Sequence, residues 1–274
     1  MNKILMLAIC LASAALAQER TLSCDEVRER EPGHTADRLP PGVTGHVAVN
    51  YCEMREVTVR ATGTLDVNGG PNGGISIKGA NRSDILVRSK IEAHADSDSV
   101  SRQIVSAIRV ETSGARVQAI GPPIEDHPGW SVSYEIFVPS NTDLTLLTHN
   151  GGISISGTLG HTQFEALNGG VTLKNLAGSV DGHTTNGGLH LELADDHWDG
   201  DHCDVSTTNG GVTIRIPANY SAHLETGTMT GGVKIDFPVS VQGEISHQIA
   251  VDLGAGGRLV RATTSTGGVH VQRM

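Results

Sequence analysis

A short motif, Asn-Gly-Gly, recurs through this chain and limits its fold more than any other feature. Thr-Gly-Gly replaces it twice near the C-terminus. From Asn150 onward, successive motifs lie 18, 18, 23, 21 and 36 residues apart. Recurrence at such a spacing is typical of repeat folds, in which each unit packs on its neighbours. The motifs begin at Asn68, Asn72, Asn150, Asn168, Asn186, Asn209, Thr230 and Thr266.

Two short strands accompany each motif. After Gly-Gly, apolar and polar residues alternate, as in Ile153-Ser154-Ile155, and this predicts a half-buried strand. Before the motif, the residues six, four and two positions upstream of the Asn or Thr are small or apolar. We expect these to point inward: Thr162, Phe164, Ala166, Val180, Gly182, Thr184, Cys203, Val205, Thr207, Leu224, Thr226, Thr228, Val260, Ala262 and Thr264.

A unit of two strands and two turns cannot bury its inward side chains alone. Stacking on the next unit, about 4.8 Å away, does so. We expect the paired glycines to supply the positive φ that the corner needs. The asparagines from Asn150 to Asn209 are placed to form a ladder of side-chain amides along the stack. The alternative is that Asn-Gly-Gly is simply a favourable turn sequence.

The first half is less regular. We expect strands at Glu56–Val67, Gly74–Lys78, Ile85–Ala93, Ile104–Thr112, Ala115–Ile120 and Val132–Pro139, with a short helix or a polar loop at Asp96–Ser106. Ile-Ser-Ile follows Asn-Gly-Gly in both halves, at Ile75 and Ile153, which indicates one continuous architecture. The expected segments are a signal peptide (1–17), an N-terminal arm (18–55), an N-terminal β segment (56–121), a Pro-rich junction and strand (122–149) and β-solenoid repeats (150–274).

The N-terminus predicts export. Lys3 precedes an apolar run from Ile4 to Leu16, and Ala15-Leu16-Ala17 matches the pattern before a signal-peptidase cut. The run is shorter than the roughly 20 residues of a membrane span, so we expect no transmembrane anchor. A lipid on Cys10 is disfavoured because Ile9 stands where a small residue is expected. The mature chain is therefore expected in the periplasm, on the outer surface or in the medium.

The net charge limits the classes of partner that this chain can bind, and the cysteines bear on the compartment in which it folds. The net charge is −10, which argues against nucleic acid as a partner. Cleavage of the signal peptide leaves Cys24, Cys52 and Cys203. In an oxidising compartment we expect a Cys24–Cys52 disulfide, and the alternative is that all three thiols are free.

The residues YEIFVPSNTDLTLLTHNGGISISG, LNGGVTLKNLAGSV, TTNGGLHLEL, TTNGGVTIRIP and TSTGGVHV follow one another in that order. Over roughly Val57 to Met274 the chain resembles the adhesin domain family of bacterial envelope proteins, a β-solenoid domain of unknown function. The resemblance implies an all-β, right-handed β-solenoid or β-roll on an exported protein, with no catalytic residues. The stretch Ala194 to Asp204 departs from the pattern by inserting five extra residues.

The insertion is the candidate metal site. Asp195, Asp196, Asp199 and Asp201 supply carboxylates that suit Ca²⁺, whereas the alternative is a solvated surface loop. The glycine-rich calcium repeat of other β-rolls does not fit, because no Gly-x-Asp follows Gly-Gly. We expect no other cofactor.

A second candidate is an outward face with an acidic row. Gln163, Asp181, Asp204 and Glu225 stand five residues before successive motifs, so like charges would be neighbours that either solvent screens or a cation bridges. Hydroxyls such as Thr208 and Thr263 share this face and suit glycans, although Thr also simply favours exposed strands.

These features predict a non-catalytic, adhesin-like or scaffold protein of the bacterial envelope that presents an extended β face to glycans or envelope proteins. The alternative is a polysaccharide-acting β-helix enzyme using Glu165, His183 and Asp181. The last unit, Thr266 to Met274, ends without an obvious cap, so self-assembly through an open solenoid end is a third hypothesis.

Overall fold

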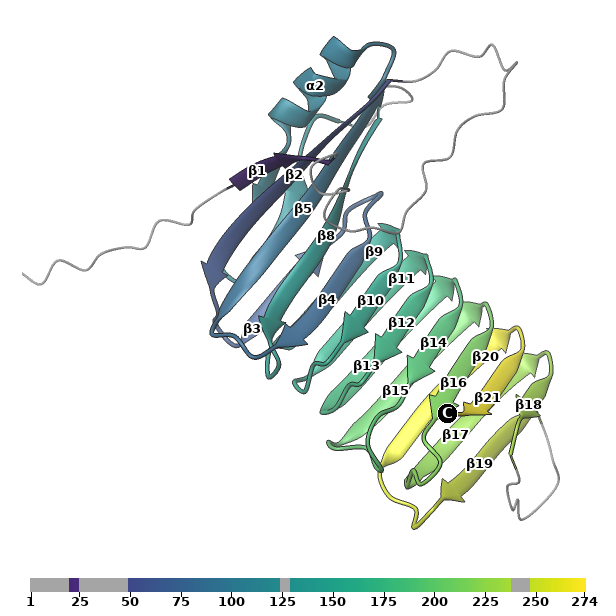
Figure 1. Ribbon diagram of the computed structural model, residues 1–274. Coiled ribbons are helices and arrows are strands. Elements are labelled where there is room, and N and C mark those ends of the chain that lie inside the picture. Colours follow the sequence, from purple (N-terminus) through teal and green to yellow (C-terminus); the bar gives the residue numbers. More distant parts are fainter. Residues whose placement is uncertain (1–19, 25–48, 124–128, 238–246) are drawn as a thin grey trace, which may run out of the picture.

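The structure is a computed structural model that describes residues 20–24, 49–123, 129–237 and 247–274. The chain is all-β: its strands form two mixed sheets whose buried faces pack together in one elongated body (Figure 1). The expected signal peptide and its cleavage site lie outside the described residues, as does most of the N-terminal arm. No helix in the described part of the chain is long and apolar enough to cross a membrane.

Sheet A has 11 strands among the described residues. In spatial order they are β1 (Arg20–Ser23), β2 (Val49–Arg60), β5 (Asp84–Ala95), β8 (Gly129–Pro139), β4 (Ile75–Ala80), β10 (Ile153–Ser156), β12 (Val171–Lys174), β14 (Leu189–Glu192), β16 (Val212–Ile216), β21 (Val269–Arg273) and β18 (Val233–Ile235).

Sheet B has 10 strands in the same part of the chain. Their order is β19 (Gln248–Leu253), β17 (Ala222–Thr230), β20 (Leu259–Thr266), β15 (His202–Asn209), β13 (Ser179–Asn186), β11 (Thr162–Asn168), β9 (Asp143–Asn150), β3 (Thr64–Asn68), β7 (Arg116–Ile120) and β6 (Arg109–Glu111).

Counterpart strands around successive motifs pair in parallel and in register. In sheet A, Ile153 aligns with Val171, and Val171 aligns with Leu189. In sheet B, Asn168 aligns with both Asn150 and Asn186. Of the residues expected to point inward, all but the half-buried Gly182 are buried. The period-two pattern therefore predicted the core face of both sheets correctly.

In the N-terminal half, two of the expected strands differ from those in the structure. Ile104–Thr112 is wrong as a single strand, because helix α2 (Asp98–Ala107) continues to Ala107 and only β6 follows. The Ser97 hydroxyl accepts a hydrogen bond from the Val100 amide at the helix start. At the other end, the Arg55 guanidinium donates to the carbonyls of Val105 and Ile108. The expected strand Glu56–Val67 is divided into β2 and β3.

Both halves share the same sheets. Strand β4 lies between β8 and β10, and Ile75 aligns in parallel with Ile153, as the shared Ile-Ser-Ile suggested. Helix α2 lies beside β2 and β5 at the N-terminal end of the body (Figure 1).

In the Asn-Gly-Gly motifs from Asn150 onward, the first glycine is required for a different reason from the one expected. Gly151, Gly169, Gly187 and Gly210 do not have positive φ, whereas Gly231 and Gly267 of the two Thr-Gly-Gly motifs have φ values of 151° and 147°, as expected. Instead, a Cβ atom on Gly169 would overlap the carbonyl group of Gly151, and the same relation holds along the stack. The second glycine has more room: a Cβ on Gly170 would lie 3.5 Å from the Gly188 oxygen. Close approach of neighbouring backbones, not turn conformation, explains the first glycine of these Asn-Gly-Gly motifs.

Side-chain hydrogen bonds link these turns along the stack. The Asn168 amide donates to the Asn150 oxygen at 2.8 Å, and Asn186 donates to Asn168 at 2.8 Å. Asn150 bonds to Asn72 and Asn209 bonds to Asn186, so the expected asparagine ladder is confirmed. These asparagines are exposed rather than inward.

The buried threonine two positions before a motif forms a second set of bonds. The Thr207 hydroxyl donates to the Gly187 carbonyl at 2.8 Å, and Thr184 donates to Gly169 at 2.9 Å. We expect Thr207→Val to lower the free energy of unfolding by about 1–2 kcal/mol, because it leaves a partly buried carbonyl without its donor. Thr213→Val, on the outward face of β16, should change it by less than about 0.5 kcal/mol. Chemical denaturation of both variants measures the difference, and equal losses would contradict the explanation.

The C-terminal strands do not end the stack. Strand β21 lies between β16 and β18, and β20 lies between β15 and β17. The premise that Thr266–Met274 leaves an open end is therefore wrong, since both of its edges are paired. The ends of the two sheets are instead β18 and β19, and β19 runs antiparallel to β17.

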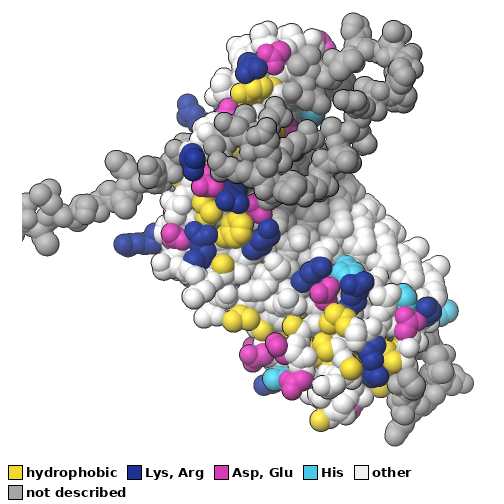
Figure 2. Space-filling model, viewed as in Figure 1, with side chains coloured by type: hydrophobic (Ala, Val, Ile, Leu, Met, Phe, Trp, Pro, Cys, Tyr) yellow, Lys and Arg dark blue, Asp and Glu magenta, His cyan; other side chains and the backbone are white. Residues whose placement is uncertain are grey.

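Charged side chains are grouped on the face turned to the viewer in Figure 2, with a white area of uncharged groups between two clusters. One network on sheet A joins Glu135 to Lys78 at 2.7 Å and to Arg88 at 3.2 Å. Partial burial raises the pKa of the Glu135 carboxyl, but the hydrogen bonds and charges of Lys78 and Arg88 outweigh it and hold the pKa below its usual value.

This network predicts that the stability of the fold depends on pH. A carboxylate whose pKa is lower in the folded chain stabilises the fold above its unfolded pKa, and the effect is lost as the pH falls through the folded value. We expect Glu135→Gln to flatten the fall in melting temperature below about pH 4.5, where the unfolded carboxyl begins to bind protons. The control is Glu111→Gln, which removes an exposed carboxylate bonded to the Gln118 amide. A profile unchanged by Glu135→Gln would contradict the prediction.

Candidate binding face

The outward face of sheet B collects all five residues expected on a binding face. Parallel registers place Asp181, Asp204 and Glu225 in one row, and Thr263 and Thr208 in two adjacent rows. All five side chains belong to half-buried residues between the inward positions of β13, β15, β17 and β20. The face is built by strands alone, and each strand is paired on both sides, in parallel except where β17 meets the antiparallel β19.

The acidic row also contains a cation, Arg261, which stands five residues before Thr266. Arg261 of β20 lies between Asp204 and Glu225. Its guanidinium contacts the Asp204 carboxylate at 2.8 Å and the Glu225 carboxylate at 2.7 Å. Both carboxylates, that of Glu225 foremost, raise the pKa of Arg261. The expected contact between like charges is therefore wrong for Asp204 and Glu225. Neither solvent screening nor an added cation is needed between these two carboxylates.

Histidines accompany the other carboxylates of the face. His202 contacts Asp181 at 3.0 Å. His223 contacts Asp252 at 2.7 Å and Glu225 at 3.5 Å. The face thus presents paired donors and acceptors rather than a uniform negative field.

His183 is held in place by hydroxyl groups. Its Nδ1 atom lies 3.0 Å from the Ser206 hydroxyl, and its Nε2 atom lies 3.1 Å from the Thr208 hydroxyl. Glu165 aligns with His183 on the neighbouring strand. Because both ring nitrogens already have partners, the imidazole serves the face as a fixed polar group.

The insertion does not gather its carboxylates. Asp196 contacts His197 at 2.6 Å, while Asp201 accepts a hydrogen bond from Ser179 at 3.2 Å. The residues described here include no group of three or more His, Cys, Asp or Glu side chains arranged to hold a metal ion. Asp195 and Asp199 therefore do not complete a cluster with them.

The loop does have an ordered anchor. Trp198 is 3% exposed, and its indole nitrogen donates to the Gly178 carbonyl at 3.0 Å. The Gly178 amide in turn donates to the Asp199 carbonyl at 2.7 Å. Beside the loop lies a shallow cavity of about 510 Å³ lined by Trp198, Asp201 and Arg258, among others.

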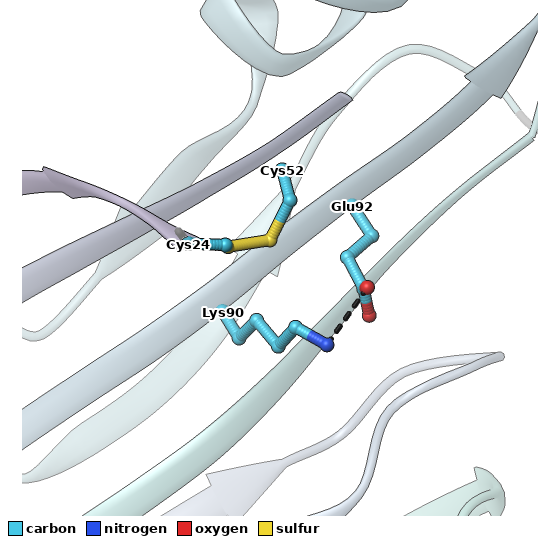
Figure 3. Close-up of a disulfide and its surroundings, with 4 residues drawn as sticks. All are labelled: Cys24, Cys52, Lys90 and Glu92. Carbon is cyan, nitrogen blue, oxygen red and sulfur yellow. Dashed lines mark ion pairs between the residues drawn. A yellow bond between two sulfur atoms is a disulfide. The ribbon is translucent and has the colours of Figure 1, made fainter. Parts of the chain in front are cut away.

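The cysteines occupy two environments. Cys24 and Cys52 form a disulfide with a Cα–Cα distance of 5.7 Å, near the ion pair of Lys90 and Glu92 at 2.8 Å (Figure 3). The bond holds the chain after edge strand β1 against β2. Cys203 is a buried free thiol whose pKa is raised, mainly by burial, so it acts as a small apolar side chain of β15.

Sequence reasoning missed Arg261, His202 and His223. The position of Arg261 beside both acids could not be predicted, because β20 lies between β15 and β17 although it follows both in the chain. The two histidines share a row, seven residues before Asn209 and Thr230, that sequence reasoning did not consider.

Comparisons with known proteins give distant structural likenesses. No family model matches the chain, and no curated protein matches it. A "putative cell adhesion protein" from Clostridium sporogenes ATCC 15579 is 14% identical, with a TM-score of 0.39 over 81% of this chain and 99% of that one. A "putative adhesin" from Bacteroides fragilis NCTC 9343 is 11% identical, with a TM-score of 0.40 over 81% and 97%.

A "putative lipid binding protein" from Parabacteroides distasonis ATCC 8503 is 13% identical, with a TM-score of 0.30 over 80% of this chain and 96% of that one. TM-scores this low do not establish a shared fold, and identities this low do not establish a shared function.

Proposed function

We propose that this chain is an exported, non-catalytic, adhesin-like protein that binds glycans through the outward face of sheet B. The observation that supports this most is the contiguous set of paired polar groups: Asp181 with His202, Asp204 and Glu225 with Arg261, and Ser206 and Thr208 with His183. Sugar hydroxyls both donate and accept hydrogen bonds, so a face of alternating donors and acceptors suits them.

The strand backbone keeps these groups at fixed spacings. Neighbouring strands lie about 4.8 Å apart, so polar groups repeat at that distance along each row. A rigid face loses little conformational entropy on binding, which favours affinity for an extended polymer. The same geometry would serve contacts with other envelope proteins, which we place second.

We further propose that the parallel strands from Asn150 onward belong to a right-handed β-solenoid, with the N-terminal segment as its other part. Cleavage before Gln18 would release this domain outside the cytoplasm. The disulfide supports export, because such bonds persist in oxidising compartments.

The polysaccharide-acting enzyme fits the geometry less well. It would use Glu165 and His183, but both ring nitrogens of His183 contact hydroxyls. A general base needs a free nitrogen that can reach a substrate proton. The strand positions of these residues place them on an open row of the face.

Binding of the purified chain from Gln18 to Met274 to arrays of glycans and envelope fractions tests the proposal. We expect saturable binding, weakened at least about tenfold, or roughly 1.4 kcal/mol, by the double variant Asp181→Ala/Thr208→Ala. The matched control, Thr172→Ala/Thr213→Ala, removes two hydroxyls from the outward face of sheet A and should leave the affinity unchanged. A folded protein that binds no glycan, or equal losses in both variants, would overturn the assignment.

A further inference from the structure

The C-terminal segment Leu259–Met274 fills a space between two parts of the chain that precede it. We call this space the terminal slot: its walls are β15 and β16 on one side and β17 and β18 on the other. Val260 aligns with Cys203 on one wall and with Leu224 on the other. Val269 aligns with Val212 and Val233 in the same way. The segment is thus paired along both edges in both sheets.

The walls of the terminal slot are joined before the segment that fills it. Residues 217–221 connect β16 directly to β17, and this connection passes over one strand position in each sheet. An unfilled slot would leave backbone groups of four strand edges without partners. Such edges bind another strand through main-chain hydrogen bonds.

The contacts made by the filling segment are the general contacts of the stack. The Thr264 hydroxyl donates to the Gly210 carbonyl at 2.8 Å, as Thr207 does to Gly187. Val260, Ala262 and Val271 are fully buried. Arg261 adds the two ion pairs with the walls, to Asp204 and Glu225. None of these contacts depends on which chain supplies the segment.

The connection to the segment is rich in glycine. Between β19 and β20, Gly254, Gly256 and Gly257 have φ values of 55°, 73° and 142°, in the region that favours glycine. The turn carries the chain from one side of β17 to the other. A different path for these few residues would deliver the segment to a neighbouring molecule instead.

We propose that the terminal slot is an assembly site for a second copy of this chain, in which two molecules exchange Leu259–Met274 reciprocally. Exchange of an identical element is a low-cost route to a dimer, because each contact is kept. Folding of the two walls ahead of the segment gives the exchange its opportunity, since the N-terminal parts of a chain fold first during synthesis. Two binding faces per assembly would then raise avidity for a polymeric ligand.

Concentration should control the exchange. A short flexible linker holds a tethered segment at an effective concentration on the order of millimolar. Filling within one molecule should therefore exceed exchange by roughly a hundredfold at about 10 µM chain, and the two should be comparable near 1 mM.

A pair of variants, each with one added cysteine besides the Cys24–Cys52 disulfide, detects the exchange. Ser206 and Thr263 are aligned neighbours on the outward face of sheet B. One copy carries Ser206→Cys and the other carries Thr263→Cys, both with Cys203→Val. The two are unfolded together, refolded at about 10 µM to 1 mM across the range set by the linker, oxidised and run on a non-reducing gel. Exchange seats the segment of one copy in the slot of the other and so brings the two added cysteines together.

Controls separate exchange from collision and from poor geometry. Glu165→Cys and His183→Cys lie in the same row but on interior strands, so exchange of the C-terminal segment cannot bring them together. A single chain carrying both Ser206→Cys and Thr263→Cys should oxidise internally, which shows that the geometry permits the bond. We expect at least about ten times more mixed dimer from the 206/263 pair than from the 165/183 pair near 1 mM.

Equal yields from the two pairs, or internal oxidation without mixed dimer at every concentration, would overturn the proposal. Neither result bears on glycan binding by a single chain, so the proposed function is tested separately.

Discussion

Replacing Gly169 with alanine should destabilise the protein by about 3 kcal/mol, at the upper end of the cost of overpacking. A Cβ atom at this position would overlap the Gly151 carbonyl group, which belongs to the backbone of the neighbouring strand connection. Backbone on both sides is held by parallel pairing, so the stack would have to separate locally. For a chain of this size, we expect the melting temperature to fall by roughly 6–12 °C.

The adjacent glycine is the control. Gly170→Ala adds the same methyl group one residue later, where the nearest described atom, the Gly188 oxygen, lies 3.5 Å from the new Cβ. We expect a change within about 0.5 kcal/mol. Thermal and chemical unfolding of the two variants measure the contrast. Similar losses at both sites would show that turn conformation, not close approach, requires the first glycine.

The second large effect concerns one pair in the core. Gly182 aligns with Phe164 on the neighbouring strand, and a Cβ on Gly182 would overlap the Phe164 ring. The glycine therefore leaves space for the one phenylalanine in this inward column. We expect Gly182→Ala to cost about 2–3 kcal/mol, because the buried ring has to leave its position.

A double-mutant cycle isolates this contact. In a Phe164→Leu background, Gly182→Ala should cost less than about 1 kcal/mol, so the two changes should couple by at least about 1 kcal/mol. Leu146, on the other side of Phe164, shows that this column accepts leucine. Additive losses would mean that Gly182 is needed for a reason other than the ring.

Local spacing predicted the parts of the fold that depend on neighbouring residues. The inward positions, the asparagine ladder and the match between Ile75 and Ile153 all follow from counting along the chain. The expected strand Ile104–Thr112 was wrong because its apolar residues fit the period of a helix as well as that of a strand. Val105 and Ile108 are buried at the end of helix α2, where Arg55 of β2 bonds to their carbonyls.

The candidate site was less predictable because it depends on strand order. The spacing of Asp204 and Glu225 implies adjacent strands, whereas the structure places Arg261 between them. A step of 36 residues between the last two motifs does not reveal that the later one returns to an earlier position. Only the pairing of both edges of β20 and β21 settles the order.

The bonds between Asn168 and its two counterparts have a consequence for how the length of such a protein changes. Each asparagine side chain donates one hydrogen bond to the repeat on one side and accepts one from the repeat on the other. Every such repeat therefore presents the same donor and acceptor to its two neighbours. Removing the 18 residues from one motif to the next would bring matching surfaces together. The body can therefore gain or lose whole repeats during evolution without a change in the contacts between them. An insertion shorter than one repeat would instead have to project from the stack as a loop.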